Sequence, residues 1–400
     1  MTLIIAAAPI TTLFAVSLMT ELPFTALLLA LILLVEARKV SGGRALLAGL
    51  LGAAAFLTRT NAIVLLAAIP IVLLPQRLYR QTLAFVAPLL AAIAGWQTWC
   101  ATRSFRAADL TTAYYTSYTS FYAWTFSWAD LPHRVWANAD GIIESLARLV
   151  LFHNGDEPWI RALSWVITAA AAGGVVNLYR RGIRYYPTFA ALLVVVLLLW
   201  QYPPDQRFVY PLFPLYVAGL ATKMMEIGSV AVRSWKTATG GNRVAAIPVL
   251  LAIAGLSIGS VWSDVEGTFV LLPSYFSERQ EQLTRLHPVW QWIAGNTAAD
   301  ARFAACDDAL LYLYSRRHGY TEVILPGVIY GDQAIAVPAY IEGLPAMWRR
   351  VGITHVLFTD FDFLRDLHTP GHDALGRLLS GSPQFQLLYA DKAARVYAVR

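Results

Sequence analysis

The stretch ALLAGLLGAAAFLTRTNAIVLLAAIPIVLLP, residues 45–75, decides the fold class of this chain. It is apolar except for a polar break that runs from Thr58 through Arg59 and Thr60 to Asn61. A helix that crosses a bilayer needs about 20 apolar residues, so this stretch is too long for one span and short for two. We interpret it as a broken helical hairpin. A charged side chain at membrane depth has to face protein or a water-filled cavity, so Arg59 predicts such a cavity.

The composition of the whole chain supports the same class. Of 400 residues, 57% are hydrophobic and only 14% are charged, and the mean hydropathy is +0.52. Soluble domains carry roughly 25% charged residues, so a soluble enzyme is excluded. Two cysteines, Cys100 and Cys306, exclude a disulfide scaffold. The sequence has no Gly-rich phosphate loop and no zinc-type histidine spacing, so we expect no metal and no cofactor.

Seven further runs are apolar and long enough to cross a bilayer. Together with the broken hairpin they predict about nine membrane segments within residues 1–262, and therefore an α-helical polytopic membrane domain. The runs lie near residues 3–19, 22–37, 82–100, 160–178, 185–202, 207–224 and 244–262.

The distribution of basic residues predicts the orientation. Residues 1–262 hold 19 basic and 10 acidic side chains, whereas residues 263–400 hold 12 and 15. The basic excess lies in short clusters between apolar runs, which indicates membrane topology and argues against nucleic acid as a partner. The positive-inside rule predicts a multi-pass protein with a cytoplasmic N-terminus and an extracytoplasmic C-terminus, and we expect its membrane to be a bacterial inner membrane. The clusters on the cytoplasmic side are Arg38, Lys39 and Arg44; Arg77 and Arg80; Arg180, Arg181 and Arg184; and Lys223, Arg233, Lys236 and Arg243.

Two long segments are then predicted outside the cytoplasm. The first, residues 101–159, contains an aromatic cluster between Tyr114 and Trp128 and an amphipathic stretch from about Leu131 to Phe152. Such a segment is expected to lie along the membrane surface. Its aromatic side chains, among them Tyr118 and Trp124, could stack on a sugar or serve as interfacial anchors.

The second segment, residues 263–400, has the charge density of a soluble domain. We predict a small extracytoplasmic α/β domain that folds independently from about residue 275 and helps to choose an acceptor. The motif Asp360-Phe-Asp362 imitates a metal-binding Asp-x-Asp pattern, which we interpret as accidental. The predicted helices lie near 287–295, 308–315, 340–350 and 373–380, and the predicted strands at 302–306, 354–359, 384–389 and 394–399.

Several motifs, in order along the chain, resemble the GT-C superfamily of membrane glycosyltransferases. They are a Ser/Thr-Glu before a Leu-rich span, in Ser17-Leu-Met-Thr-Glu21-Leu-Pro-Phe24; a small-residue helix from Arg44 to Gly52 that leads to Leu57-Thr-Arg59-Thr-Asn61; and an Arg-aromatic-x-x-Pro pattern in Pro203-Pro-Asp205-Gln-Arg207-Phe-Val-Tyr-Pro211. The resemblance covers nearly the whole chain. It implies a polyprenyl-phosphate-linked sugar as donor, membrane lipid as surroundings, and an acceptor that the sequence does not identify.

The resemblance also implies roles for individual residues. Arg59 and Arg207 would bind the lipid phosphate in a bidentate fork, with Asn61 and Asp205 beside them, and Tyr118 and Trp124 would contact the substrate. Glu21 would be the catalytic carboxylate. The alternatives are structural: Arg59 could pair with a carboxylate, Arg207 could snorkel from a span end, and Glu21 could cap a tight turn.

One departure from the family pattern defines the alternative function. The family's catalytic carboxylate lies in an acidic first external loop, and no acidic residue precedes Glu21 here. A catalytically inactive or truncated GT-C-like scaffold is therefore the second hypothesis. A transporter is the third, although a transporter favours paired broken helices and only one broken segment is evident.

Overall fold

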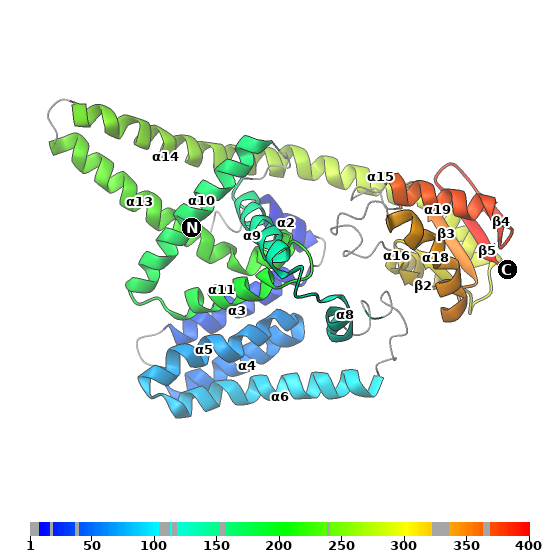
Figure 1. Cartoon of the computed structure of the whole chain (residues 1–400), viewed down its shortest axis with the longest axis horizontal. Helices are drawn as coiled ribbons and strands as arrows, with labels where there is room; N and C mark the ends of the chain where they lie inside the picture. The colour runs from blue at the N-terminus through cyan, green and yellow to red at the C-terminus, as the bar shows by residue number, and fades with distance from the viewer. Residues whose placement is uncertain are drawn as a thin grey trace. The chain divides into compact units, whose positions relative to one another are not determined.

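The computed structural model describes residues 8–16, 19–36, 40–103, 113, 118–151, 157–237, 241–321, 336–362 and 369–400. The chain divides into two compact units, Met1–Leu272 and Pro273–Arg400. Both units are drawn in Figure 1, the first from blue to yellow-green and the second from yellow to red. The boundary follows Leu272, whereas the sequence placed it after residue 262.

Every regular element among the described residues of the first unit is a helix. Its α-helices are α2 (Pro9–Val16), α3 (Glu21–Val35), α4 (Gly42–Thr58), α5 (Leu65–Leu73), α6 (Tyr79–Arg103), α8 (Tyr118–Thr125), α9 (Leu131–Arg148), α10 (Pro158–Arg180), α11 (Tyr185–Leu198), α12 (Gln206–Val209), α13 (Phe213–Thr237) and α14 (Gly241–Glu266). Short 3-10 helices cover Thr60–Val64, Leu74–Gln76 and Tyr210–Leu212, and a π-helical turn covers Gly267–Leu271.

Glycines allow two pairs of these helices to touch backbone to backbone. A Cβ atom on Gly49 of α4 would lie 2.4 Å from the carbonyl oxygen of Phe85 in α6, and one on Gly174 of α10 would lie 1.8 Å from the carbonyl oxygen of Gly219 in α13. Both distances are far below van der Waals contact. Close approach over small residues is typical of helix pairs in membranes, where packing replaces the hydrophobic effect as the attraction between helices.

Three described helices are long and apolar enough to cross a membrane, Tyr79–Thr102, Pro158–Arg180 and Gln206–Trp235. Shorter apolar helices cover Glu21–Val35, Gly42–Thr58, Thr60–Gln76 and Tyr185–Leu198. Large apolar side chains such as Leu83, Trp99 and Val166 are exposed on the long helices, which is the surface expected of a helix that faces lipid. These features suggest a membrane protein, and the number and orientation of the spans stay predictions. Residues 1–7, 17–18 and 152–156, which belong to predicted segments, lie outside the described residues.

The helix break predicted within residues 45–75 is confirmed, whereas the pairing of its two halves as a hairpin stays a prediction. Helix α4 ends at Thr58, and Arg59 has an extended backbone with φ −148° and ψ 127°. A 3-10 turn over Thr60–Val64 then leads into α5. The polar residues therefore mark a real interruption of the helix, and the Arg59 side chain leaves the chain at this point.

The second unit contains a five-stranded sheet with helices on both faces (Figure 1). The strand order is β2-β1-β3-β5-β4; β1 pairs in parallel with β2 and β3, and β5 pairs antiparallel with β3 and β4. Its elements are α15 (Leu272–Asn296), β1 (Arg302–Ala305), α16 (Asp308–Ser315), β2 (His318–Thr321), α18 (Ala336–Val351), β3 (His355–Thr359), α19 (Thr369–Gly381), β4 (Phe385–Ala390) and β5 (Ala394–Val399).

Alternation along the strands divides the core of this unit into two layers. In β3, Val356 and Phe358 pack with α18 and α19, whereas Leu357 packs with α15 and α16. Successive side chains of a strand point to opposite faces, so the middle of this strand, covered on both sides, is apolar at three consecutive positions. The four helices and four strands predicted in this region are confirmed, although α15, α18 and α19 extend beyond the predicted bounds. Strand β2 was missed.

Asp362 lies buried in the turn after β3. Its Oδ2 accepts the Thr359 backbone N–H at 2.7 Å, and its Oδ1 accepts the Thr359 hydroxyl at 2.6 Å. Burial raises the pKa of Asp362 to about 7, against the effect of these hydrogen bonds. Both carboxylate oxygens are therefore occupied by the turn, which agrees with the interpretation of Asp360-Phe-Asp362 as an accidental match to a metal motif.

The raised pKa predicts a pH-dependent stability for the second unit. Between about pH 4 and pH 7 the folded state keeps the Asp362 proton and the unfolded state releases it, so stability should fall as the pH rises through this window, by up to about 4 kcal/mol. A fragment covering residues 273–400 should fold and show this dependence in thermal unfolding between pH 5 and pH 8. Asp362→Asn should flatten the curve, and equal slopes for the two proteins would contradict the prediction.

Candidate functional site

A buried carboxylate is the centre of the candidate site in the first unit. Glu21 is the first residue of α3, and its side chain is 0% exposed. Its Oε1 accepts a hydrogen bond from Arg59 Nη1 and a second one from Arg207 Nε at 2.9 Å. A negative charge is favourable in the first turn of a helix, and a buried charge needs paired, hydrogen-bonded partners. The two arginines meet this requirement.

The helix break delivers Arg59 to this carboxylate. The extended backbone at residue 59 turns the side chain out of the α4 axis, while the Arg59 N–H still donates to the Ala55 carbonyl at 2.8 Å. Besides Glu21, the guanidinium reaches the Thr20 hydroxyl at 3.4 Å and lies 6.0 Å from the centre of the Phe208 ring. The Arg59 side chain is 13% exposed. Its observed partner is therefore a carboxylate, the structural alternative considered for it.

Arg207, 186 residues after Glu21 in the sequence, is the second partner of the carboxylate. Asp205 caps the short helix α12, and its Oδ1 accepts the Arg207 backbone N–H at 2.9 Å. This cap orients the first turn of α12 so that the Arg207 side chain extends to Glu21. The Arg207 side chain is 47% exposed, and among the described residues only Glu21 accepts a hydrogen bond from its guanidinium. Its terminal nitrogens are available to an anion.

Helix α9 holds the loop that precedes Asp205. The fully buried Asn138 donates from Nδ2 to the carbonyl oxygens of Leu197, Leu198 and Trp200 at 3.1, 3.0 and 2.7 Å. Ser145 donates to the Pro204 carbonyl at 2.9 Å. Asn138 thus holds carbonyls at and just beyond the end of α11, and Ser145 holds the loop that leads to Asp205. The amphipathic stretch predicted from Leu131 is thus a helix whose polar buried side chains position the site.

Sequence reasoning did not identify this support. Asn138, Gly141 and Ser145 lie three and four residues apart, so they share one face of α9. A Cβ atom on Gly141 would lie 2.8 Å from Cβ of Pro203. The small and amide side chains on one face of this amphipathic helix were the sequence pattern that could have predicted a loop packed against it.

The structure brings together four of the predicted site residues and separates the others from them. Glu21, Arg59, Arg207 and Asp205 form the cluster described above. Asn61 lies half-buried in the 3-10 turn after Arg59, and no hydrogen bond joins its side chain to another described residue. Tyr118 and Trp124 belong to α8, and their side chains lie outside the part of the chain that the structure describes.

The described residues contain no group of three or more His, Cys, Asp or Glu side chains that could hold a metal ion. No protein-family model matches the chain, and comparison with curated proteins finds no match. The functional interpretation therefore depends on the geometry of the cluster and on the motifs that carry the family resemblance.

Proposed function

We propose that this chain is a membrane glycosyltransferase of GT-C type, which transfers a sugar from a polyprenyl-phosphate donor to an extracytoplasmic acceptor in the cell envelope. The observation that carries the proposal is the half-exposed Arg207, held by its Nε on the buried Glu21. The remaining guanidinium nitrogens match phosphate oxygens in a bidentate fork. Apolar helices around the cluster would accommodate the lipid tail of such a donor.

Within this proposal the two arginines have different tasks. Arg59 is largely buried and neutralises Glu21, so it maintains the cluster. Arg207 is accessible and would bind the donor phosphate, stabilising the negative charge that develops as the sugar leaves. Glu21 remains the proposed catalytic carboxylate; its Oε1 is occupied by both arginines, whereas its buried Oε2 has no hydrogen-bond partner and could accept the proton of an acceptor hydroxyl only after the side chains that cover it have moved.

Substitution of Arg207 tests donor binding directly. We expect Arg207→Ala to weaken binding of a labelled polyprenyl-phosphate hexose to the purified full chain by about tenfold or more, because a charged hydrogen-bonding partner is worth roughly 1.5 to 3 kcal/mol. Arg207→Lys should lie between wild type and alanine, since it keeps the charge and loses the fork. Arg180→Ala, which removes an exposed arginine at the end of α10, is the matched control.

The outcomes separate the two leading functions. Undiminished donor binding by Arg207→Ala would refute the proposed phosphate site. Donor binding that depends on Arg207, without sugar transfer to any envelope acceptor tested, would instead favour the inactive scaffold.

The proposed orientation has its own test. With a cytoplasmic N-terminus and an extracytoplasmic second unit, alkaline phosphatase fused after Arg400 should be active in intact bacteria, because this enzyme acquires its disulfides outside the cytoplasm. A fluorescent reporter that matures only in the cytoplasm should stay dark at the same position. The reverse pattern would show that the assignment of the Lys/Arg clusters to the cytoplasmic side is wrong.

A further inference from the structure

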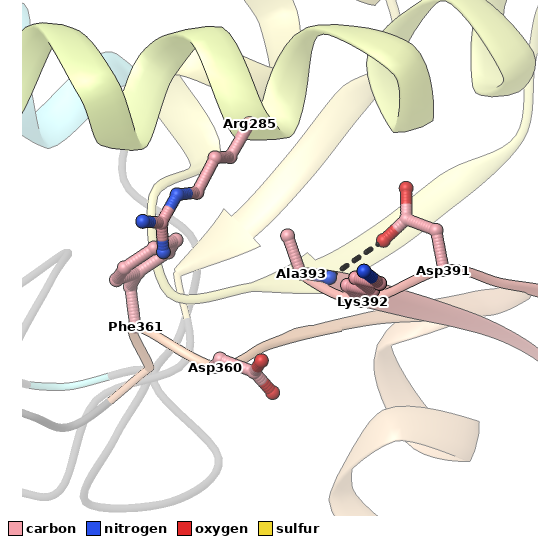
Figure 2. Close-up of a pocket in the computed structure, with 6 residues that line it drawn as sticks. All are labelled: Arg285, Asp360, Phe361, Asp391, Lys392 and Ala393. Atoms are coloured by element: carbon pink, nitrogen blue, oxygen red, sulfur yellow. Dashed lines mark hydrogen bonds between the residues drawn. The ribbon is translucent and has the colours of Figure 1, made fainter.

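An open pocket of about 560 Å³ lies within the second unit, far along the chain from the arginine cluster. Three segments form it: α15 contributes Arg285, the turn after β3 contributes Asp360 and Phe361, and the turn between β4 and β5 contributes Asp391, Lys392 and Ala393. Figure 2 shows Arg285 extending from α15 toward Phe361, with the two turns facing the same space. The volume falls in the range of small-molecule sites.

The pocket occupies the edge of the sheet where ligands of α/β folds commonly bind. Strand β3 ends at Thr359, so Asp360 and Phe361 follow the carboxyl end of a parallel strand. The next strand in the sheet, β5, runs antiparallel to β3. Ligands of open α/β sheets bind beyond the carboxyl ends of the strands, and the turn after β3 lies at such an end.

Hydrogen bonds hold the two turns in place. The Asp360 backbone N–H donates to the Ala393 carbonyl at 3.0 Å, which ties the turn after β3 to the turn before β5. Asp391 Oδ1 accepts the N–H groups of Ala393 and Ala394, both at 2.8 Å, and Asp391 Oδ2 accepts the Tyr389 hydroxyl at 2.6 Å. The bond to Ala393 is drawn in Figure 2. The pocket walls are thus pre-organised without a ligand.

Some charged side chains of the pocket already have partners, and others are free to bind a ligand. Asp391 is used by the turn, and Arg285 pairs with Glu281 on its own helix. The exposed Asp360 carboxylate and Lys392 ammonium have no side-chain partner among the described residues. The pocket therefore offers a free acceptor pair, a free donor and the half-buried Phe361 ring. Because Glu281 already pairs with Arg285, the charged groups at the pocket have no positive excess.

We propose that this pocket binds a neutral carbohydrate unit. The Asp360 carboxylate accepts hydrogen bonds from adjacent sugar hydroxyls, Lys392 donates to a third oxygen, and the Phe361 ring contacts the apolar face of the sugar. A lining without positive excess favours an uncharged sugar over a uronic acid or a sugar phosphate. This site does not depend on the donor function proposed for the arginine cluster.

Saturation-transfer NMR on the full chain tests the proposal. The protein is held in nanodiscs of phospholipid without sugar headgroups, so that no detergent sugar competes. The probes are the methyl glycosides of glucose, mannose and galactose, with glucuronic acid as the charged comparison. We expect at least one neutral glycoside to bind, Asp360→Ala to weaken its binding about tenfold or more, Lys392→Gln to weaken it less, and Asp300→Asn, at another exposed aspartate of this unit, to leave it unchanged.

Absence of binding by every neutral glycoside, or unchanged binding by Asp360→Ala, would overturn the proposal. Binding of glucuronic acid alone, abolished by Lys392→Gln, would overturn the neutral class of ligand. Thermal unfolding of each variant checks that this exposed edge has kept its fold. Binding of the polyprenyl donor, measured in parallel, should be the same for wild type and Asp360→Ala, so the two sites can fail independently.

Discussion

Glu21→Ala should lower the thermal stability of the first unit by about 10 °C or more. The substitution leaves Arg59 buried at 13% exposure without its carboxylate, and removing one partner of a buried ion pair costs roughly 3 to 5 kcal/mol. Thermal unfolding of the purified chain in detergent measures the effect. Glu144→Ala is the control, because Glu144 pairs with Arg148 at a partly exposed surface of α9, where an ion pair is worth about 0 to 1 kcal/mol.

A double variant distinguishes charge pairing from simple packing. Glu21→Leu with Arg59→Met replaces the buried pair by apolar side chains, which is often neutral for stability, and Arg207 can extend its charge to solvent. The double variant should therefore be more stable than Glu21→Ala. If it is equally unstable, the loss in the single variant does not arise from an uncompensated guanidinium.

Gly174→Ala should separate α10 from α13. The added Cβ would lie 1.8 Å from the Gly219 carbonyl oxygen, and this contact is with backbone, so no side chain can rotate to relieve it. Overpacking costs typically 1 to 3 kcal/mol, and we place this variant at the upper end, with a fall in melting temperature of about 10 °C. The neighbouring Gly173 is the control. A Cβ there would meet only Lys223 side-chain carbons at 3.7 and 3.8 Å, so Gly173→Ala should be close to wild type.

Local signals in the sequence predicted much of the architecture. The polar interruption at Thr58–Asn61 predicted the helix break because a charge in an apolar run cannot remain in lipid. In the second unit, apolar runs of strand length predicted β1, β3, β4 and β5. Strand β2 was missed since His318-Gly-Tyr-Thr321 is short and lacks the apolar alternation of a strand. Helix continues from α14 through Gly267–Leu271 into α15, so no break in secondary structure marks the division of the two compact units after Leu272.

The candidate site was predictable only as a set of separate residues. Glu21, Arg59 and Arg207 were each predicted as site residues. Nothing in the sequence indicated that Glu21 pairs with Arg59 and Arg207, which follow it by 38 and 186 residues. Such pairing depends on how helices pack, which follows from glycine contacts and loop bonds far from the cluster. Asn138 shows the same limit: an amide within an amphipathic helix gives no indication of which carbonyls it will meet.

The two arginine partners of Glu21 are synthesised at different times. Glu21 and Arg59 emerge early and can pair as soon as α3 and α4 meet, whereas Arg207 is synthesised almost 150 residues later, after the loop that Asn138 holds. The second guanidinium can reach Oε1 only when α11 and α12 have joined the earlier helices. The complete cluster therefore forms only after α11 and α12 have packed on the earlier helices. In a nascent chain that stops before residue 207, Glu21 can pair with Arg59 alone.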